Sequence, residues 1–232
     1  MSAALDDDLK RILAGRRDRL EVFDAISPAT TALLVVDMQR AWTDPQGPWF
    51  FPEARTVIPP ANALASALRK AGGTVIWVQH ATGAPGTPEY WSNYLDHFVS
   101  DAQRAGALAA IQEGSPFRAL DPALDVAPGD LTIVKRRYSA MLHTSSNLEA
   151  VLRERGIDTV IVTGVQTNMC VESTARDAMM LDFKVFMPHD AAEARTPEDH
   201  LAGLRTIAQV FADIRPAAEV VALIEGASVR TP

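Results

Sequence analysis

Five apolar runs rich in β-branched residues recur along the chain and predict the strands of a sheet. They occupy residues 31–38, 73–80, 130–136, 158–164 and 183–188. Continuous apolar runs of this length are typical of strands that are covered on both faces. Between them, residues 59–73 (PPANALASALRKAGG) have helical spacing and end on the glycine pair expected after a helix C-terminus. This alternation predicts an α/β fold whose parallel sheet is built by right-handed crossovers.

Two segments interrupt this rhythm and are expected to lie at the ligand-binding end of the sheet. Residues 41–60 hold five prolines and two tryptophans, and residues 81–130 contain no apparent strand. Open α/β sheets bind ligands outside the carboxyl ends of their strands. The aromatic residues of these segments are therefore expected either to line a partly apolar pocket or to pack against a neighbouring subunit. They are Trp42, Trp49, Phe50, Tyr90 and Trp91.

The chain is expected to form one domain over residues 31–232, preceded by an extension at residues 1–30. No internal repeat or linker marks a further domain boundary. Residues 6–23 have the pattern of a short amphipathic helix. Such a helix packs either outside the domain or on a partner subunit, and the pattern does not distinguish between the two.

The composition predicts a folded protein and excludes several classes of partner. Of the 232 residues, 47% are hydrophobic and 22% are charged, and the formal net charge is −7. A nucleic-acid binder usually carries a clustered basic face, and the longest basic run here is only Lys135 to Arg137. One cysteine allows no internal disulfide, and the sequence shows neither a signal peptide nor an apolar run long enough to span a membrane. We therefore expect a cytoplasmic protein that binds neither nucleic acid nor membrane.

Three residues with catalytic potential follow three of the predicted strands. Asp37 ends the first strand, Lys135 ends the third, and Cys170 comes six residues after the end of the fourth. Each has an ordinary structural explanation alone, as a turn former, a solvated lysine and a small buried apolar residue. Because the carboxyl ends of parallel strands meet at one edge of a sheet, their coincidence instead predicts a shared site.

The three side chains have complementary roles in acyl transfer. A thiol is mostly protonated at neutral pH, so a nucleophilic cysteine needs a nearby base, a cation or a helix N-terminus. Residues 171–183 predict a helix with Cys170 at its first turn, where the helix dipole favours a thiolate. Asp37 is suited to take the thiol proton and return it to a leaving nitrogen, while Lys135 orients the carboxylate and adds positive potential.

The sequence around these positions resembles the signature regions of the isochorismatase-like cysteine hydrolases. The matching stretches are VVDMQ (35–39), VKRRYSA (134–140) and TGVQTNMCVESTARDA (163–178). Within that family, the third stretch together with the Lys-x-x-Tyr-Ser pattern is most similar to ureidoacrylate and carbamoyl-amide amidohydrolases. The resemblance implies a single-domain, three-layer Rossmann-like α/β fold with a mainly parallel six-stranded sheet. It also implies a homo-oligomer, either a dimer or a tetramer.

The resemblance further implies how the site works. It assigns a catalytic triad to Asp37, Lys135 and Cys170 and a covalent thioester intermediate to the cysteine. It also implies a cis peptide bond between Val165 and Gln166. In that turn the backbone N–H groups of Gln166 and Cys170 are expected to form an oxyanion hole.

Four residues near the predicted triad are candidates for substrate binding. Gln39 lies two residues after Asp37, on the same side of an extended segment. Tyr138, three residues after the lysine, either donates a hydrogen bond to the substrate or forms part of the pocket wall. Trp42 and Trp91 are the aromatic candidates from the two long loops.

Residues that the chain lacks also narrow the reaction. The nicotinamidase branch of the family carries an Asp and two His metal ligands after its second strand, where this sequence reads WVQHATGAPG (77–86). His80 stands alone there and is interpreted as structural, so we expect neither a metal nor another cofactor. Siderophore-type isochorismatases lack the nucleophilic cysteine, so Cys170 favours hydrolysis of a small amide or ureido compound. Two alternatives stay open: vinyl ether hydrolysis and a non-catalytic binding protein of the same fold.

Overall fold

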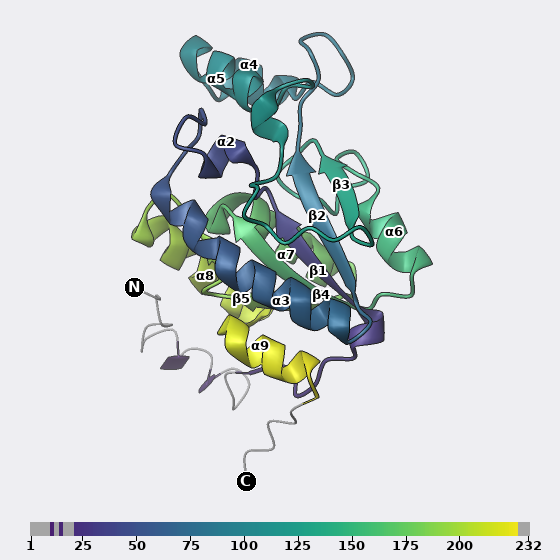
Figure 1. Cartoon of the computed structure of the whole chain (residues 1–232). Coiled ribbons are helices and arrows are strands. Elements are labelled where there is room, and N and C mark those ends of the chain that lie inside the picture. The colour runs from purple at the N-terminus through teal and green to yellow at the C-terminus, as the bar shows by residue number, and fades with distance from the viewer. Residues whose placement is uncertain (1–9, 12–13, 16–20, 227–232) are drawn as a thin grey trace.

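The computed structural model describes residues 10–11, 14–15 and 21–226, and a single parallel sheet forms the centre of this part (Figure 1). The strands are β1 (Thr31–Val36), β2 (Thr74–His80), β3 (Leu131–Lys135), β4 (Thr159–Val165), β5 (Lys184–Pro188), β6 (Ala192–Glu193) and β7 (Asp213–Arg215). Their order is β3-β2-β1-β4-β5-β7, with β6 paired to β4, and each of these pairings is parallel. The predicted α/β sheet is confirmed. Its main path has six strands, and the two-residue β6 adds a seventh.

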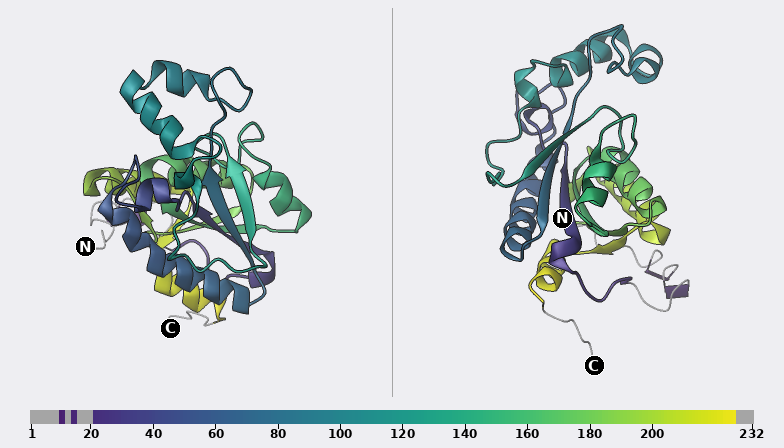
Figure 2. Two further views of the ribbon diagram at one scale, coloured as in Figure 1. Left: turned by 45° about the horizontal axis from the view of Figure 1, so that its top comes forward. Right: turned by 90° about the vertical axis from the view of Figure 1, so that its right-hand side faces the viewer.

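Helices cover both faces of this sheet, so the predicted three-layer arrangement is confirmed (Figure 2). They are α2 (Arg40–Thr43), α3 (Ile58–Lys70), α4 (Ser92–His97), α5 (Asp101–Ile111), α6 (Leu148–Glu154), α7 (Glu172–Met180), α8 (Pro197–Val210) and α9 (Ala217–Ile224). The helix predicted over residues 59–73 is α3. One layer consists of α3 and α9, and the other of α6, α7 and α8.

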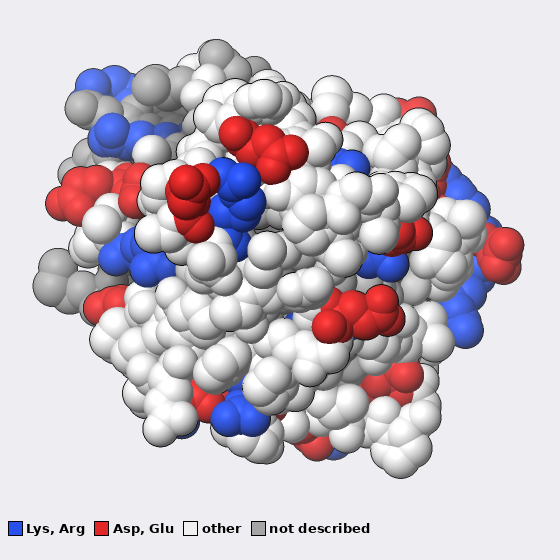
Figure 3. Space-filling view, turned by 90° about the horizontal axis from the view of Figure 1, so that it is seen from above, with Lys and Arg blue, Asp and Glu red and all other residues white. Residues whose placement is uncertain are grey.

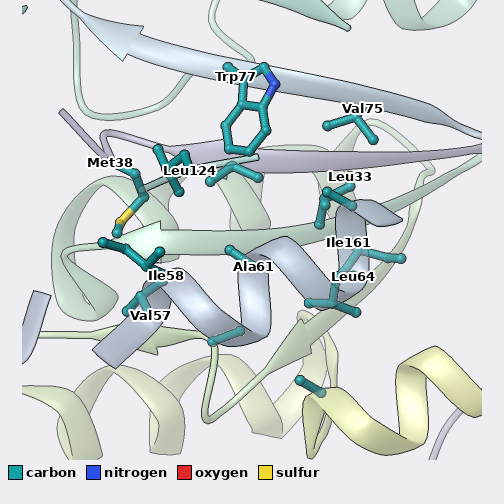
Figure 4. Packing of buried hydrophobic residues seen from close by; sticks show 14 of the residues in the cluster. Leu33, Met38, Val57, Ile58, Ala61, Leu64, Val75, Trp77, Leu124 and Ile161 are labelled. Carbon is teal, nitrogen blue, oxygen red and sulfur yellow. The ribbon is translucent and has the colours of Figure 1, made fainter. Parts of the chain in front are cut away.

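The core forms on the two faces of β1, which is completely buried. Successive side chains of a strand point to opposite faces, so Leu33 packs with the α3 layer and Leu34 with the α7 layer. Figure 4 shows Ala61 and Leu64 of α3 against the sheet beside Leu33. Burial on both faces explains why the strand is a continuous apolar run instead of an alternating one.

The part of the β2–β3 segment that contains α4 and α5 forms a cap beyond the carboxyl ends of the strands (Figure 1). As predicted, residues 81–130 contain no strand longer than an isolated bridge. They do contain α4 and α5. Ser100 and Gln103 form a reciprocal capping box at the start of α5. The cap has a small apolar cluster of its own, built around Tyr90, Leu95 and Ala107.

The outer surface at this end carries charges of both signs. Seen from above, acidic and basic side chains are scattered over a largely uncharged face (Figure 3). Within the described residues, no helix combines the length and apolar character needed to cross a membrane. The amphipathic helix predicted at residues 6–23 lies mostly outside the described residues, so this prediction and the domain boundary at residue 30 remain predictions.

Candidate active site

The three side chains predicted to be catalytic meet at the carboxyl ends of β1, β3 and β4. The Lys135 Nζ atom lies 2.9 Å from Asp37 Oδ2 and 3.2 Å from Cys170 Sγ. It also donates a hydrogen bond of 3.1 Å to the backbone oxygen of Arg137. The ammonium group, which has three protons, therefore has three acceptor atoms within 3.2 Å. Asp37 and Lys135 are fully buried, and Cys170 is only 5% exposed.

Local backbone geometry places two of these residues. Asp37 directly follows β1 with a φ of 57°, a left-handed conformation that aspartate tolerates better than most residues. Its N–H continues the ladder to β2 by donating to Val78 O at 2.8 Å. Cys170 lies in a π-helical turn, Thr167–Val171, between β4 and α7. The cysteine therefore precedes α7 instead of lying in its first turn, and π-helical turns of this kind often occur at functional sites.

Gly164 allows β4 to approach the end of β1 closely. Its φ is +113°, and a Cβ atom at this position would lie 2.0 Å from the backbone oxygen of Val36. Only glycine avoids both the conformational strain and this collision. The glycine therefore fixes the path of the chain into the turn that carries Cys170.

The turn after Gly164 has the predicted cis peptide bond between Val165 and Gln166. The Gln166 backbone oxygen accepts hydrogen bonds from Met169 N at 3.0 Å and from Val171 N at 3.2 Å. The Gln166 N–H, in contrast, donates to no backbone or side-chain acceptor within the described part of the chain. This residue lines the pocket described below together with Cys170.

The ionisation of the cluster differs from the expectation of a resting thiolate. Burial raises the pKa of the Cys170 thiol, the Asp37 carboxylate raises it further, and Lys135 offsets only part of the increase. Burial also raises the pKa of Asp37, again partly offset by Lys135. Burial lowers the pKa of Lys135, but its two anionic neighbours outweigh that effect and the net pKa is raised. These shifts favour a neutral thiol beside a charged ammonium group in the resting site.

A pocket of about 350 Å³ opens beside Cys170. The cap supplies one wall, and the strand ends and the loop after β1 supply the others. The lining residues are Trp42, Trp49, His80, Tyr94, Val99, Gln103, Tyr138, Gln166, Met169, Cys170 and Arg195. The structure thus places two of the four predicted substrate-binding residues, Trp42 and Tyr138, on the wall. Trp91 lies behind it, with ring centroids 4.8 Å from Tyr138 and 4.9 Å from Tyr94.

Contrary to the expectation from the sequence, Gln39 does not lie on the pocket wall. It is completely buried, and its Nε2 donates to the backbone oxygens of His80 at 3.1 Å and Arg118 at 2.9 Å. Its Oε1 accepts from His80 N at 2.7 Å. The amide group is consumed by backbone partners, so Gln39 fixes the end of β2 relative to the loop after β1.

His80 is a pocket residue that the sequence interpretation assigned to structure alone. It is 4% exposed, and its Nδ1 lies 4.0 Å from Asp37 Oδ2. Its ring stacks on Trp42 with 13° between the planes. Its position was the signal that could have identified it. His80 is the last residue of β2, which lies between β1 and β3 in the sheet, and it is the register partner of Lys135.

Arg195 is a second residue that the sequence interpretation missed. This residue lines the pocket, and its guanidinium donates to Trp49 O at 2.9 Å and lies 5.5 Å from the centroid of the Phe51 ring. It follows β6, a two-residue strand with no apolar pattern that would have located it.

Asp37, His80 and Cys170 also offer oxygen, nitrogen and sulfur atoms within 4.8 Å of one another. Zinc accepts such a donor set in other proteins. Here the Lys135 ammonium already contacts two of the three residues, and its raised pKa keeps it charged. A second cation at this position would be repelled at short range, so the cluster suits proton transfer better than metal binding.

Comparisons with known proteins agree with this geometry. The sequence model of the Isochorismatase domain family matches residues 31–219. The ureidoacrylate amidohydrolase RutB of Caulobacter vibrioides is 35% identical over 186 residues, which cover 75% of this chain and 81% of that protein.

Solved structures give the same result. A cysteine hydrolase from Pseudomonas syringae pv. phaseolicola superposes with a TM-score of 0.77 at 28% identity, covering 90% of this chain and 98% of the other. The N-carbamoylsarcosine amidase of Thermoplasma acidophilum, at 23% identity, shares the fold with a TM-score of 0.64 over 81% of this chain and 96% of its own. The extent of the family match and the RutB identity together show that the chain is a hydrolase and belongs to the isochorismatase family.

Proposed function

We propose that the protein is a cysteine amidohydrolase that cleaves a C–N bond of a small ureido or carbamoyl compound through a thioester, without a metal. The observation that carries this proposal is the Lys135 ammonium, which contacts both Asp37 Oδ2 and Cys170 Sγ inside a buried site. The similarity to RutB, named as a ureidoacrylate amidohydrolase, supports C–N hydrolysis as the reaction.

In the first step the Cys170 sulfur attacks the carbonyl carbon of the substrate. The thiol proton passes to Asp37, and the negative charge that develops on the carbonyl oxygen is stabilised by the backbone N–H groups of Gln166 and Cys170. The C–N bond then breaks, and the proton on Asp37 passes to the leaving nitrogen. Lys135 keeps the carboxylate and the sulfur in place and compensates the charge that moves between them.

In the second step water hydrolyses the thioester. A C–O bond forms and the C–S bond breaks, while the water proton passes to Asp37 and then to the Cys170 sulfur. From a carbamoyl group the product is carbamic acid, which decomposes to carbon dioxide and ammonia. The site thereby returns to its resting ionisation.

We further propose that the substrate carries a carboxylate away from the reacting carbonyl. Arg195 is the cationic residue among the described residues that line the pocket. Within the described part of the chain its guanidinium donates one hydrogen bond, to Trp49 O, so further N–H donors remain for an anion. Ureidoacrylate, the compound in the name of the RutB relative, has such a carboxylate.

An ammonia-release screen tests this function. The probes are ureidoacrylate, N-carbamoylsarcosine and the neutral amides in which their carboxylates are replaced by CONH₂. We expect turnover of at least one carboxylate probe and a loss of about 100-fold or more in kcat for Cys170→Ala, as for other covalent nucleophiles. Near-full activity of that variant on a substrate of the native protein would contradict the mechanism.

Arg195→Met provides the test of substrate class. Loss of a charge-assisted contact is expected to raise KM about tenfold or more for carboxylate probes and to leave KM for neutral amides nearly unchanged. Arg155→Met, at an exposed arginine after α6, is the matched control and should change neither. Equal effects on both kinds of probe would remove Arg195 from carboxylate recognition.

If the protein hydrolyses a vinyl ether instead, its activity should survive alkylation of Cys170. If it is not catalytic, it should show no activity on any probe. Iodoacetamide treatment at mildly alkaline pH before the screen separates the three cases.

Assembly into a dimer or tetramer stays a prediction from the family resemblance, and light scattering in solution measures it.

A further inference from the structure

The separation of His80 and Asp37 is one that a single bridging water molecule can span. His80 Nδ1 lies 4.0 Å from Asp37 Oδ2, which is too far for a direct hydrogen bond. A water at about 2.8 Å from each atom fits this separation with an angle near 90° between its two partners. Cys170 Sγ lies within 4.8 Å of both groups, so this water would be next to an acyl group on the sulfur.

Asp37 has acceptor capacity that the protein does not fill. Its two carboxylate oxygens are fully buried, and the donors near them in the described chain are the Lys135 ammonium and the Cys170 thiol. When Cys170 carries an acyl group, the thiol proton is gone and Asp37 keeps only Lys135. A buried carboxylate left with one donor is costly, so the acylated site favours a second donor such as water.

His80 is fixed in place and keeps a free polar ring. Gln39 binds both its backbone N–H and its backbone oxygen, and Trp42 stacks on its ring. No hydrogen bond joins the ring to a described residue. Burial and the positive charges of Lys135 and Arg137 lower the pKa of His80 well below 6.5, so the imidazole is neutral. One ring nitrogen therefore accepts and the other donates.

We propose that His80 and Asp37 together position the water that hydrolyses the thioester, an inference that rests on the proposed function above. The water donates one hydrogen bond to Asp37 and one to the acceptor nitrogen of His80, which directs an oxygen lone pair at the thioester carbon. The C–O bond forms, the C–S bond breaks, and the proton goes to Asp37 and then to sulfur. In this step His80 orients the water and Asp37 takes its proton, since burial raises the pKa of Asp37 and lowers that of His80.

The inference predicts that His80 affects deacylation more than acylation. The probe is 4-nitrophenyl acetate, which releases nitrophenolate when Cys170 is acetylated and acetate when the thioester is hydrolysed. For His80→Leu we expect a nitrophenolate burst of about one per site, followed by steady turnover at least about tenfold slower than in the wild-type protein. Intact-protein mass spectrometry should show the acetyl adduct accumulating on Cys170.

Added hydroxylamine separates water positioning from a merely structural role. This nucleophile attacks a thioester without a positioned base, so it should accelerate turnover of His80→Leu by a larger factor than that of the wild-type protein. His80→Gln, which keeps a polar side chain, is expected to recover part of the deacylation rate. His143→Leu, the same change at an exposed histidine, is the matched control and should behave as wild type.

Three outcomes overturn the inference. Deacylation of His80→Leu at the wild-type rate shows that His80 does not position the water. An equal loss in acylation and deacylation, without adduct or hydroxylamine acceleration, shows a structural effect on the whole site. Absence of any adduct on Cys170 in both the wild-type protein and His80→Leu, with this ester and with the ureido probes, removes the proposed function itself and this inference with it.

Discussion

The Lys135 ammonium lies 2.9 Å from the Asp37 carboxylate, and neither side chain is exposed to solvent. A buried ion pair of this kind gives little net stability, and removal of one partner leaves an uncompensated charge. Here the pair also contacts Cys170, so each of its two charges acts on the pKa of the same thiol, in opposite directions. This opposition leads to paired predictions.

Asp37→Asn should make Cys170 more reactive toward iodoacetamide while it abolishes turnover. The carboxylate raises the pKa of the thiol, so its removal increases the thiolate fraction at neutral pH. Turnover is lost because no base remains to carry the proton to the leaving nitrogen. Alkylation is measured by mass spectrometry under conditions where Cys170, the only cysteine, is the only thiol. Slower alkylation than in the wild-type protein would show that Asp37 does not suppress the thiolate.

Lys135→Met should lower both alkylation and turnover. The ammonium lowers the pKa of Cys170 by charge and by hydrogen bonding, so its loss shifts the alkylation profile to higher pH. Methionine matches the volume of the lysine stem, and circular dichroism checks that the variant folds. If alkylation keeps its wild-type pH profile, lysine has no part in activating the thiol.

The pH dependence of kcat/KM should have an acid limb above the ordinary range of a carboxylate. Burial raises the pKa of Asp37, partly offset by Lys135, and only the unprotonated carboxylate accepts the thiol proton. Activity is therefore present at higher pH and falls as the pH drops through this raised pKa. Because the pKa of Lys135 is raised above 10.5, the ammonium persists and causes no loss up to about pH 10. An acid limb with its midpoint at the pKa of a free carboxyl group would contradict this assignment.

The sequence pattern predicted most of the fold because burial on both faces leaves a local signature. Each of the five predicted apolar runs became a strand, and the helix over residues 59–73 is α3. The strands that escaped prediction, β6 and β7, have two and three residues, too few to show periodicity. The cap helices α4 and α5 were not among the predicted elements, because the prolines and glycine at residues 85–88 favoured a loop.

The candidate site was only partly predictable, since the outcome depends on contacts that no local pattern encodes. Asp37, Lys135 and Cys170 come together because strand ends converge, and the sequence shows which residues end the strands. Whether Gln39 faces the pocket or the backbone of His80 depends instead on the twist of a loop after β1. The ionisation of the thiol was misjudged for the same reason, because its burial is a tertiary property.

Gly164→Ala should destabilise the protein by about 3 kcal/mol or more. The positive φ disfavours alanine, and the new Cβ would collide with the backbone oxygen of Val36, which cannot move without disrupting β1. Gly106→Ala is the matched control, since Gly106 lies inside α5 with no atom near the Cβ position. That change should stabilise by about 0.5 to 1 kcal/mol. Urea unfolding measures both, and equal effects would mean that β4 and β1 separate easily at this point.

His200 should make the free energy of unfolding fall as the pH drops below the pKa of a free histidine. On α8 it is 3% exposed, and its Nδ1 lies 2.7 Å from Thr167 Oγ1, in the turn that carries Cys170. Burial, and secondarily the charge of His189, lowers its pKa from 6.5 to about 4.

The neutral form is thus favoured in the folded state, and the unfolded chain binds a proton at higher pH. The contribution is complete above pH 6.5 and declines as the pH falls toward 4. Between about pH 7.5 and pH 5, the free energy of unfolding of the wild-type protein should fall by roughly 2 kcal/mol more than that of His200→Asn. Subtracting the change measured for the variant from that of the wild-type protein cancels the contributions of the other titrating groups. If the free energy of unfolding of the variant has the wild-type pH dependence, His200 is protonated as easily in the folded protein as in the unfolded chain.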